Sequence, residues 1–222
     1  MKNHAIQAFV FDVYGTLFDV HSISKKCNEL FPGKGQLISR TWREKQIEYS
    51  NLRQLMGNYK TFYSITKDAL RYAVKKNDEH LNHHSEIELM NTYLHLSTYP
   101  EVKTVLSRLK DKKLAVFSNG SHDMLDPLLH QSDISRLFTE IISVDEVKQY
   151  KPTPASYNHA ANVLNAKPEE VLFMSSNGWD ISGAKNFGFQ TAWINRKNLP
   201  VEELNLAPDT IYEDLTGILE WN

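Results

Sequence analysis

The chain has 222 residues, of which 41% are hydrophobic, and this composition is typical of a globular protein rather than a disordered one. Its formal net charge of −2 gives no electrostatic footprint for nucleic acid or for an anionic membrane. Cys27 is the single cysteine, which excludes an internal disulfide, and residues 1–7 are polar without a signal-peptide core. We therefore predict a cytoplasmic protein.

The first strong feature along the chain is the segment 8–17, which reads AFVFDVYGTL. Its first four residues are too short and too uniformly apolar for an amphipathic helix, so they predict a central parallel strand that is buried on both faces. Asp12 follows where this strand ends. Ligands of open α/β sheets bind outside the carboxyl ends of the strands, so Asp12 is a candidate nucleophile or base. The alternative is a turn or helix-capping aspartate.

Residues 22–96 lack strand-like alternation and predict a helical insert. We expect helices over 40–56, 61–75 and 85–96, the last opened by the capping pattern Ser85-Glu86-Ile87-Glu88. On the first of these helices Trp42, Gln46, Tyr49 and Arg53 share one stripe, with Ile47 beside it.

The connection 77–84 contains His80, His83 and His84, which raises a metal site as one interpretation. The segment has no cysteine and no His-Glu-x-x-His pattern, and both are features that metal sites of this kind use. A solvated loop is therefore the preferred interpretation.

From Pro100 onward the pattern becomes strand, loop and helix in repetition. This alternation indicates an α/β protein with a parallel, doubly wound sheet. The predicted strands are 114–117, 141–144, 171–174 and 191–194, and the predicted helices are 102–110, 122–131, a helix ending near 164, and 181–187.

Polar residues follow three of the predicted strands. Asp12, Ser118 and Ser175 each stand just past a strand end, so a parallel sheet would bring them to one edge although the sequence separates them widely. The turns that contain them also offer small residues and glycine, which allow backbone N–H groups to point at an anion. This expected convergence predicts a site at that edge.

Several motifs resemble, in order and spacing, the L-2-haloacid dehalogenases of the haloacid dehalogenase superfamily. They are FDVYGTL at 11–17, WREKQIEY at 42–49, SNGS at 118–121, YKP at 150–152 and SSNGWD at 175–180. The resemblance covers nearly the whole chain. It implies a Rossmann-like parallel sheet core at 1–19 and 97–222 and an inserted helical cap subdomain at 20–96.

The same resemblance assigns expected roles around the nucleophile. Asp12 would attack the halogen-bearing carbon and form an ester, and Thr16 would orient it. Lys151 and Arg43 are the matching cations, which would keep the carboxylate ionised. Arg43 would also meet the substrate carboxylate or the departing halide, whereas without the resemblance it would be interpreted as a solvated helix arginine.

Further residues match the remaining steps of the family reaction. Asn119 would share the halide cradle, and Ser118 with adjacent backbone amides would anchor the substrate carboxylate. The ester would then be hydrolysed by a water that Asp180 activates, although Asp180 could instead be the N-cap of the following helix. The other residues expected in this step are Lys151, Tyr157, Ser175 and Asn177.

An apolar wall around a short alkyl chain is expected from four side chains, for which ordinary core packing is the alternative. They are Tyr14, Ile47, Phe62 and Trp179.

The activity implied by the resemblance is hydrolysis of short (S)-2-haloalkanoic acids to (R)-2-hydroxyalkanoic acids. The expected partners are the small haloacid and water, without cofactor, metal ion, nucleic acid or membrane. A homodimer is also expected from the family, with apolar cap side chains as its interface.

Three other functions are alternatives to this activity. A magnesium-dependent phosphatase of the superfamily carries a second aspartate two residues after the nucleophile, where this chain has Tyr14. A non-catalytic small-molecule binder is a second rival, although every matched position is filled. A serine hydrolase is disfavoured because the chain has no Gly-x-Ser-x-Gly elbow.

Overall fold

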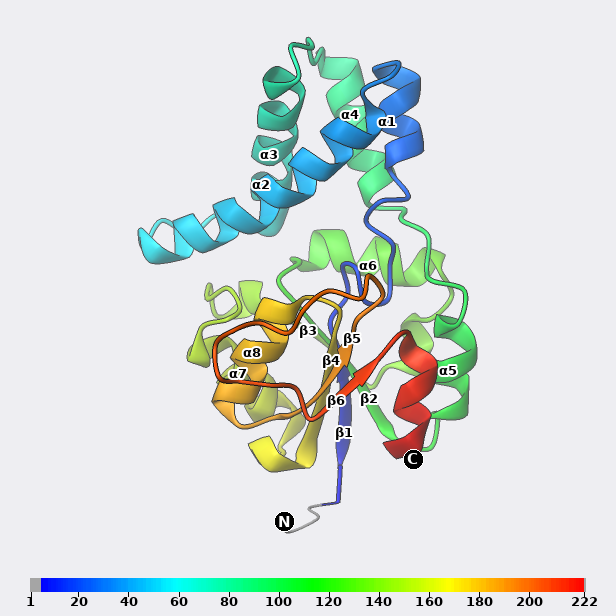
Figure 1. The fold of residues 1–222 in the computed structure, drawn as a ribbon, viewed down its shortest axis with the longest axis vertical. Coiled ribbons are helices and arrows are strands. Elements are labelled where there is room, and N and C mark those ends of the chain that lie inside the picture. The colour runs from blue at the N-terminus through cyan, green and yellow to red at the C-terminus, as the bar shows by residue number, and fades with distance from the viewer. Residues whose placement is uncertain (1–4, 222) are drawn as a thin grey trace. The chain divides into compact units, whose positions relative to one another are not determined.

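The computed structural model describes residues 5–221, so residues 1–4 of the predicted polar segment and residue 222 lie outside the described part. The chain divides into two compact units, which we call the core unit and the helical unit (Figure 1). The core unit comprises Met1–Phe18, Thr98–Asn119 and Asp133–Asn222, and the helical unit comprises Asp19–Ser97 and Gly120–Ser132. This grouping places residues 120–132 with the helical unit, whereas the division made from the sequence includes them in the core domain.

The core unit is built on a six-stranded parallel sheet with the strand order β3-β2-β1-β4-β5-β6. All four residues of β1 are buried, because β1 pairs with β2 on one side and β4 on the other. The order and the parallel pairing are those of a doubly wound α/β sheet, which confirms the predicted fold class. The strands are β1 (Ala8–Phe11), β2 (Lys113–Ser118), β3 (Glu140–Ser143), β4 (Val171–Ser175), β5 (Gln190–Ile194) and β6 (Thr210–Tyr212).

Helices cover both faces of this sheet. Figure 1 shows α7 (Pro154–Leu164) and α8 (Gly178–Phe187) on one side, and α5 (Val102–Arg108) with a 3₁₀ helix at Leu215–Trp221 on the other. The sequence did not predict β6 or this 3₁₀ helix. The three residues of β6 are exposed or half-buried, so they carry no apolar run that would mark a strand.

The helical unit contains α1 (Ser24–Leu30), α2 (Gly35–Leu55), α3 (Phe62–Lys76), α4 (His83–Tyr93) and α6 (His122–Gln131). The Thr61 side chain caps α3 by accepting a hydrogen bond from the Ser64 N–H. The Asn82 side chain caps α4 in the same way, so that helix begins two residues before the predicted start. Asn82, rather than Ser85, is therefore its N-cap, because the Asn82 carboxamide reaches the Ser85 N–H at 2.9 Å.

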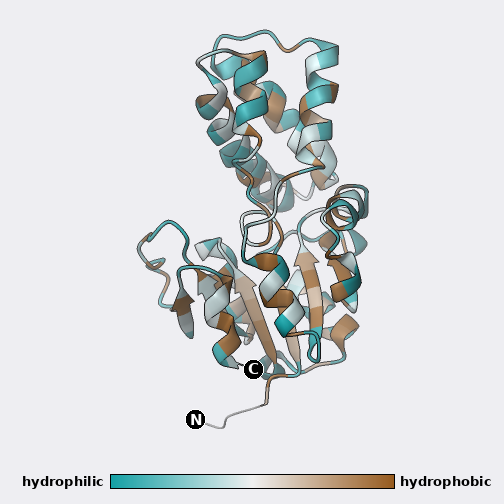
Figure 2. Ribbon diagram, turned by 90° about the vertical axis from the view of Figure 1, so that its right-hand side faces the viewer, coloured by the Kyte–Doolittle hydropathy of each residue, from teal (hydrophilic) through white to brown (hydrophobic). Residues whose placement is uncertain are grey.

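Hydropathy follows these elements. Figure 2 shows hydrophobic residues concentrated in the strands of the sheet, whereas the helices alternate between hydrophobic and hydrophilic residues. Cys27 is buried in α1, and burial raises the pKa of its thiol to about 12. Within residues 5–221, no helix combines the length and the apolar character that crossing a membrane requires.

Candidate active site

The carboxyl ends of β1, β2 and β4 meet at one edge of the sheet and bring distant residues together. Phe11, the last residue of β1, pairs with Val116 of β2 and Met174 of β4. The Asp12 N–H continues this register by donating to the Met174 carbonyl at 2.8 Å. Asp12 therefore lies beside the end of β4, where Ser175 stands.

The Asp12 carboxylate is buried and engaged by side chains on both oxygens. Lys151 Nζ donates to Oδ1 at 3.0 Å. Oδ2 accepts from Thr16 Oγ1 at 3.0 Å, Asn177 Nδ2 at 2.9 Å and Ser175 Oγ at 3.3 Å. This is not the arrangement of a turn or capping aspartate, whose oxygen would bind backbone N–H groups. A carboxylate held by one cation and several neutral donors is suited to act in its ionised form.

Lys151 places a single ammonium between two carboxylates. Its Nζ lies 3.0 Å from Asp12 Oδ1 and 2.6 Å from Asp180 Oδ2, and it also donates to the Phe117 carbonyl at 3.2 Å. Burial by itself lowers the pKa of this amine, but the Asp12 and Asp180 carboxylates outweigh burial, so the pKa is raised and Lys151 stays protonated. The ammonium also lies 4.9 Å from the centre of the Phe117 ring.

Asp180 is fully buried in the first turn of α8. Burial raises the pKa of its carboxyl to about 6, although Lys151 opposes this shift. Its Oδ1 accepts a hydrogen bond from the Tyr157 hydroxyl at 2.8 Å. The interpretation of Asp180 as an N-cap is wrong, because Asn177 holds that position and the Asp180 side chain turns to Lys151 and Tyr157 instead. A buried carboxylate with a pKa near neutrality is a suitable general base.

Tyr157, on α7, is buried, and burial followed by the Asp180 charge raises the pKa of its phenol well above the usual range. The phenol therefore acts as a neutral donor to Asp180. Its position depends on close packing between α7 and α8 at Gly183, where a Cβ atom would collide with the Tyr157 hydroxyl and with the Pro152 ring. Glycine at this position brings the two helices close enough for the contact with Asp180.

Thr16 is held by a residue that the sequence analysis did not assign to the site. The Ser176 N–H donates to Thr16 Oγ1 at 2.8 Å, which leaves the Thr16 hydroxyl hydrogen for Asp12. Gly15 has a φ of 91°, and a Cβ atom there would lie 3.0 Å from Ser176 Oγ. Ser176 belongs to the 175–180 motif, which could have indicated a role in the site. It acts through its backbone N–H, however, and residue type does not reveal a backbone hydrogen bond.

The other predicted residues of the core unit lie at the same edge. Ser118 is the last residue of β2 and is fully buried, and Asn119 Oδ1 accepts a hydrogen bond from the Lys151 N–H at 2.9 Å. Tyr14 is buried, and its carbonyl accepts from Asn177 Nδ2 at 3.4 Å. Trp179 is half-buried, with an indole N–H that has no hydrogen-bond partner.

Three predicted site residues belong to the helical unit. Arg43 and Ile47 are half-buried on α2, and Phe62 is the buried first residue of α3. Arg43 Nη1 donates to Gln46 Oε1 at 2.7 Å. Gln46 lies on the predicted helical stripe of 40–56 but is not among the predicted site residues.

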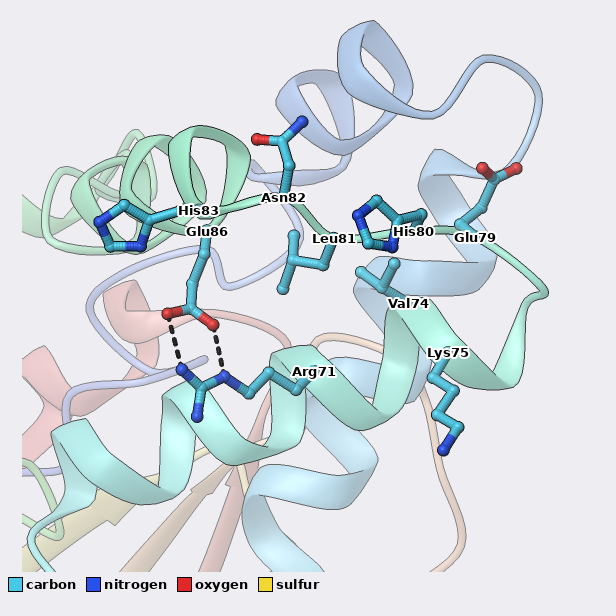
Figure 3. Close-up of a pocket in the computed structure, with 9 residues that line it drawn as sticks. All are labelled: Arg71, Val74, Lys75, Glu79, His80, Leu81, Asn82, His83 and Glu86. Atoms are coloured by element: carbon cyan, nitrogen blue, oxygen red, sulfur yellow. Dashed lines mark hydrogen bonds and ion pairs between the residues drawn. The ribbon is translucent and has the colours of Figure 1, made fainter.

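The histidine-containing segment borders a cavity of about 540 Å³ between α3 and α4 (Figure 3). Figure 3 shows His80 and His83 on either side of Leu81, and the Arg71–Glu86 ion pair beside them. All three histidines are exposed, and His83 and His84 form the start of α4 rather than part of a loop. Among residues 5–221 no group of three or more His, Cys, Asp or Glu side chains is placed to hold a metal ion.

The class of protein follows from the fold and from comparison with known families. The site at the edge of the doubly wound sheet contains a buried carboxylate, Asp12, beside Lys151 and a second carboxylate, Asp180. The first can act as a nucleophile and the second as a general base, which together allow hydrolysis through a covalent intermediate. A family model described as haloacid dehalogenase-like hydrolase matches residues 6–188.

Individual relatives narrow this class. The chain is 41% identical to an (S)-2-haloacid dehalogenase of Pseudomonas putida over 100% of this chain and 97% of the relative. A crystal structure of an L-2-haloacid dehalogenase has 42% identity and a TM-score of 0.96, and covers 98% of this chain and 99% of its own. The L-2-haloacid dehalogenase of Xanthobacter autotrophicus, solved with chloropropionic acid covalently bound, has 38% identity, a TM-score of 0.91 and 96% coverage of each chain.

The chain belongs to the haloacid dehalogenase-like hydrolases and, within them, to the (S)-2-haloacid dehalogenase family. This confirms the resemblance on which the sequence analysis relied.

Proposed function

We propose that this protein hydrolyses short (S)-2-haloalkanoic acids to (R)-2-hydroxyalkanoic acids through an ester on Asp12, without a metal ion. The observation that carries the proposal is the Lys151 ammonium, which bridges Asp12 at 3.0 Å and Asp180 at 2.6 Å. It pairs a carboxylate that can act as nucleophile with one that can act as base, and it supplies a positive charge from the protein itself. The names of the relatives, and the covalent chloropropionic acid in one of them, support the same chemistry.

In the first step an Asp12 oxygen attacks the carbon that bears the halogen. The new carbon–oxygen bond forms as the carbon–halogen bond breaks, and the halide leaves with the bonding electron pair. The attack inverts the configuration of that carbon. We assign anion binding to Arg43, Ser118 and Asn119, and the apolar surroundings of the alkyl chain to the side chains Tyr14, Ile47, Phe62 and Trp179.

In the second step water hydrolyses the ester at the Asp12 carboxyl carbon. Asp180 takes the proton from water, and its pKa of about 6 keeps it ionised at neutral pH. The tetrahedral intermediate then collapses as the bond between the Asp12 carboxyl carbon and the ester oxygen breaks, and the proton held by Asp180 passes to that oxygen. The hydroxy acid leaves with one original Asp12 oxygen, water supplies the replacement, and the second proton of the water is released to solvent. Thr16, Ser175 and Asn177 already donate to Asp12 Oδ2, so they are placed to stabilise negative charge that develops there.

The absence of a metal requirement is supported by the residues themselves. The position two residues after Asp12 is held by the buried Tyr14, a neutral phenol in place of the carboxylic acid that a phosphatase of the superfamily has there. Lys151 already offsets one of the two negative charges of the carboxylate pair. The division into a core domain and a cap subdomain, and the homodimer, remain predictions of the sequence.

The test is halide release from separate (S)- and (R)-2-chloropropionate, each with and without EDTA. We expect release from the S form alone, unaffected by EDTA and reduced at least ~10³-fold in Asp12→Asn, which lacks the nucleophile. Asp111→Asn, on the exposed surface, is the matched control and should keep full activity. Magnesium-dependent turnover of a phosphate ester without halide release would replace the proposal with a phosphatase.

A single turnover in ¹⁸O-labelled water tests the ester. The label should enter Asp12 rather than the hydroxy acid, because the product carries away an oxygen of Asp12. Label in the product after the first turnover would instead indicate direct attack of water on the substrate carbon.

A further inference from the structure

Gln46 is a polar side chain that is completely buried in α2. Its carboxamide oxygen accepts two hydrogen bonds, from Arg43 Nη1 at 2.7 Å and from the Tyr93 hydroxyl at 2.9 Å. Its nitrogen donates to Thr66 Oγ1 at 2.6 Å. Burial of an amide costs free energy unless its groups are paired, and here both its oxygen and its nitrogen are engaged.

The direction of this amide is fixed by its neighbours. The Thr66 hydroxyl donates to the Phe62 carbonyl at 2.7 Å, so toward Gln46 it can only accept. Thr66 is itself held in α3, where its carbonyl accepts from Trp42 Nε1 at 2.7 Å. The Gln46 nitrogen must therefore face Thr66. Its oxygen must face Arg43, since a guanidinium has only donors.

The other side chains that contact Gln46 are neutral. Gln46 and Thr66 carry no charge, and burial raises the pKa of the Tyr93 phenol, which keeps it protonated. A carboxylate in place of the Gln46 amide would form a charge-assisted pair with the guanidinium and neutralise it. A neutral acceptor such as the Gln46 amide orients the cation without adding a negative charge beside it.

We infer that Gln46 is a positioning residue that orients Arg43 for the anion of the reaction without neutralising its charge. The inference rests on the proposed function, in which Arg43 binds the substrate carboxylate or the departing halide. The inference goes beyond the proposed reaction in one respect: the hydrogen-bond acceptor beside Arg43 must be uncharged.

Two substitutions of similar size separate orientation from charge. Gln46→Glu keeps an acceptor but adds a negative charge, and Gln46→Met removes the acceptor and adds no charge. We expect Gln46→Glu to lower kcat/KM for (S)-2-chloropropionate by about tenfold to a hundredfold and to weaken inhibition by added bromide by a similar factor. Gln46→Met should lower kcat/KM less and retain more of the bromide inhibition.

The matched control is Ser50→Ala, one turn further along α2. Ser50 is also buried and polar, but its hydroxyl donates to the Ile47 carbonyl. It should keep wild-type kinetics. A purely structural role of Gln46 would instead lower thermal stability in both Gln46 variants and leave bromide inhibition of the folded enzyme unchanged.

A spectroscopic measurement tests positioning independently of turnover. The guanidinium NMR signals of Arg43, assigned with Arg43→Lys, should show restricted rotation in the wild type and faster rotation in Gln46→Met. If the wild type releases no halide but this difference is present, the proposed function fails and the positioning role stands. If halide is released but both Gln46 variants keep wild-type kinetics and Arg43 signals, the positioning role is overturned.

Discussion

The core unit and the helical unit hold their cations in opposite ways. In the core unit the Lys151 ammonium lies between the carboxylates of Asp12 and Asp180, so its charge is balanced within the site. In the helical unit Arg43 is held by the uncharged amide of Gln46, which adds no negative charge beside the guanidinium.

This difference matches the chemistry that each cation is proposed to serve. Lys151 must keep two buried carboxylates ionised, which requires a direct ion pair because burying an unpaired charge is costly. Arg43 is proposed to attract an anion that arrives from solution, and a carboxylate neighbour would weaken that attraction. In the core unit the cation is therefore paired with buried carboxylates, and in the helical unit the cation is hydrogen-bonded to a buried neutral amide.

Removal of the balancing cation should give the largest effect. Lys151→Met leaves Asp12 and Asp180 buried without a counter-ion, and breaking a buried pair in this way costs ~3–5 kcal/mol. We expect loss of halide release and a raised Asp180 pKa, since Lys151 is the main group that opposes the effect of burial. Denaturant unfolding and halide assays measure the two effects. If the free energy of unfolding of this variant equals that of the wild type, the ammonium does not stabilise the two buried carboxylates as proposed.

The charge balance in the core unit also predicts a pH dependence. Asp180 has a pKa of about 6, so the base is protonated below that pH and kcat should fall about tenfold per pH unit there if hydrolysis is rate-limiting. The ester on Asp12 should accumulate under the same conditions, as detected by mass spectrometry after an acid quench. Undiminished turnover well below pH 6 without ester accumulation would contradict the role of Asp180 as base.

The same pKa has a consequence for stability. Because the folded-state value of about 6 lies above the ordinary value of 3.8, the folded protein binds the Asp180 proton more tightly than the unfolded chain does. The resulting stabilisation is present at low pH and is lost as the pH rises toward and through 6. The free energy of unfolding of the wild type, relative to Asp180→Asn, should therefore decrease over that range.

A third change disturbs the packing that supports the core site without altering its charges. Gly183→Ala introduces a Cβ atom that would collide with Tyr157 and Pro152, and overpacking of this kind costs ~1–3 kcal/mol. We expect a lower Tm and a kcat reduced through displacement of the Tyr157 hydroxyl from Asp180. Asn186→Ala, at an exposed position of α8, is the control and should change neither quantity.

The smallest effect is expected in the helical unit. Tyr93→Phe removes one donor from the Gln46 oxygen but leaves its hydrogen bond with Arg43, so we expect about 1 kcal/mol of destabilisation and less than about threefold change in kcat/KM. A loss of activity as large as that expected for Gln46→Glu would show that Tyr93 itself positions the cation. The neutral group that positions Arg43 in the helical unit would then be the Tyr93 phenol rather than the Gln46 amide.

Much of the core unit could be predicted from the sequence because its signals are local. Four-residue runs predicted the strands from β1 to β5, and in the helical unit α6 was predicted with its observed bounds. Helix starts were less accurate, since the capping residue was not always the expected one. Asn82 begins α4 two residues early, and Asn177 begins α8 three residues early, so that Asp180 lies inside the helix rather than capping it.

The sequence alone determined the chemical inventory: an aspartate directly after a buried strand, polar turns after two further strands, and a lysine and a second aspartate in matching motifs. Only the tertiary structure decided how these groups pair. Lys151 contacts Asp12 across 139 positions of sequence, and Gln46 contacts Thr66 across 20. Strand register and helix packing bring such residues together, and neither is encoded in the local periodicity of hydrophobic residues. For the same reason the orientation of the Gln46 amide and the collision at Gly183 could be seen only in the folded chain.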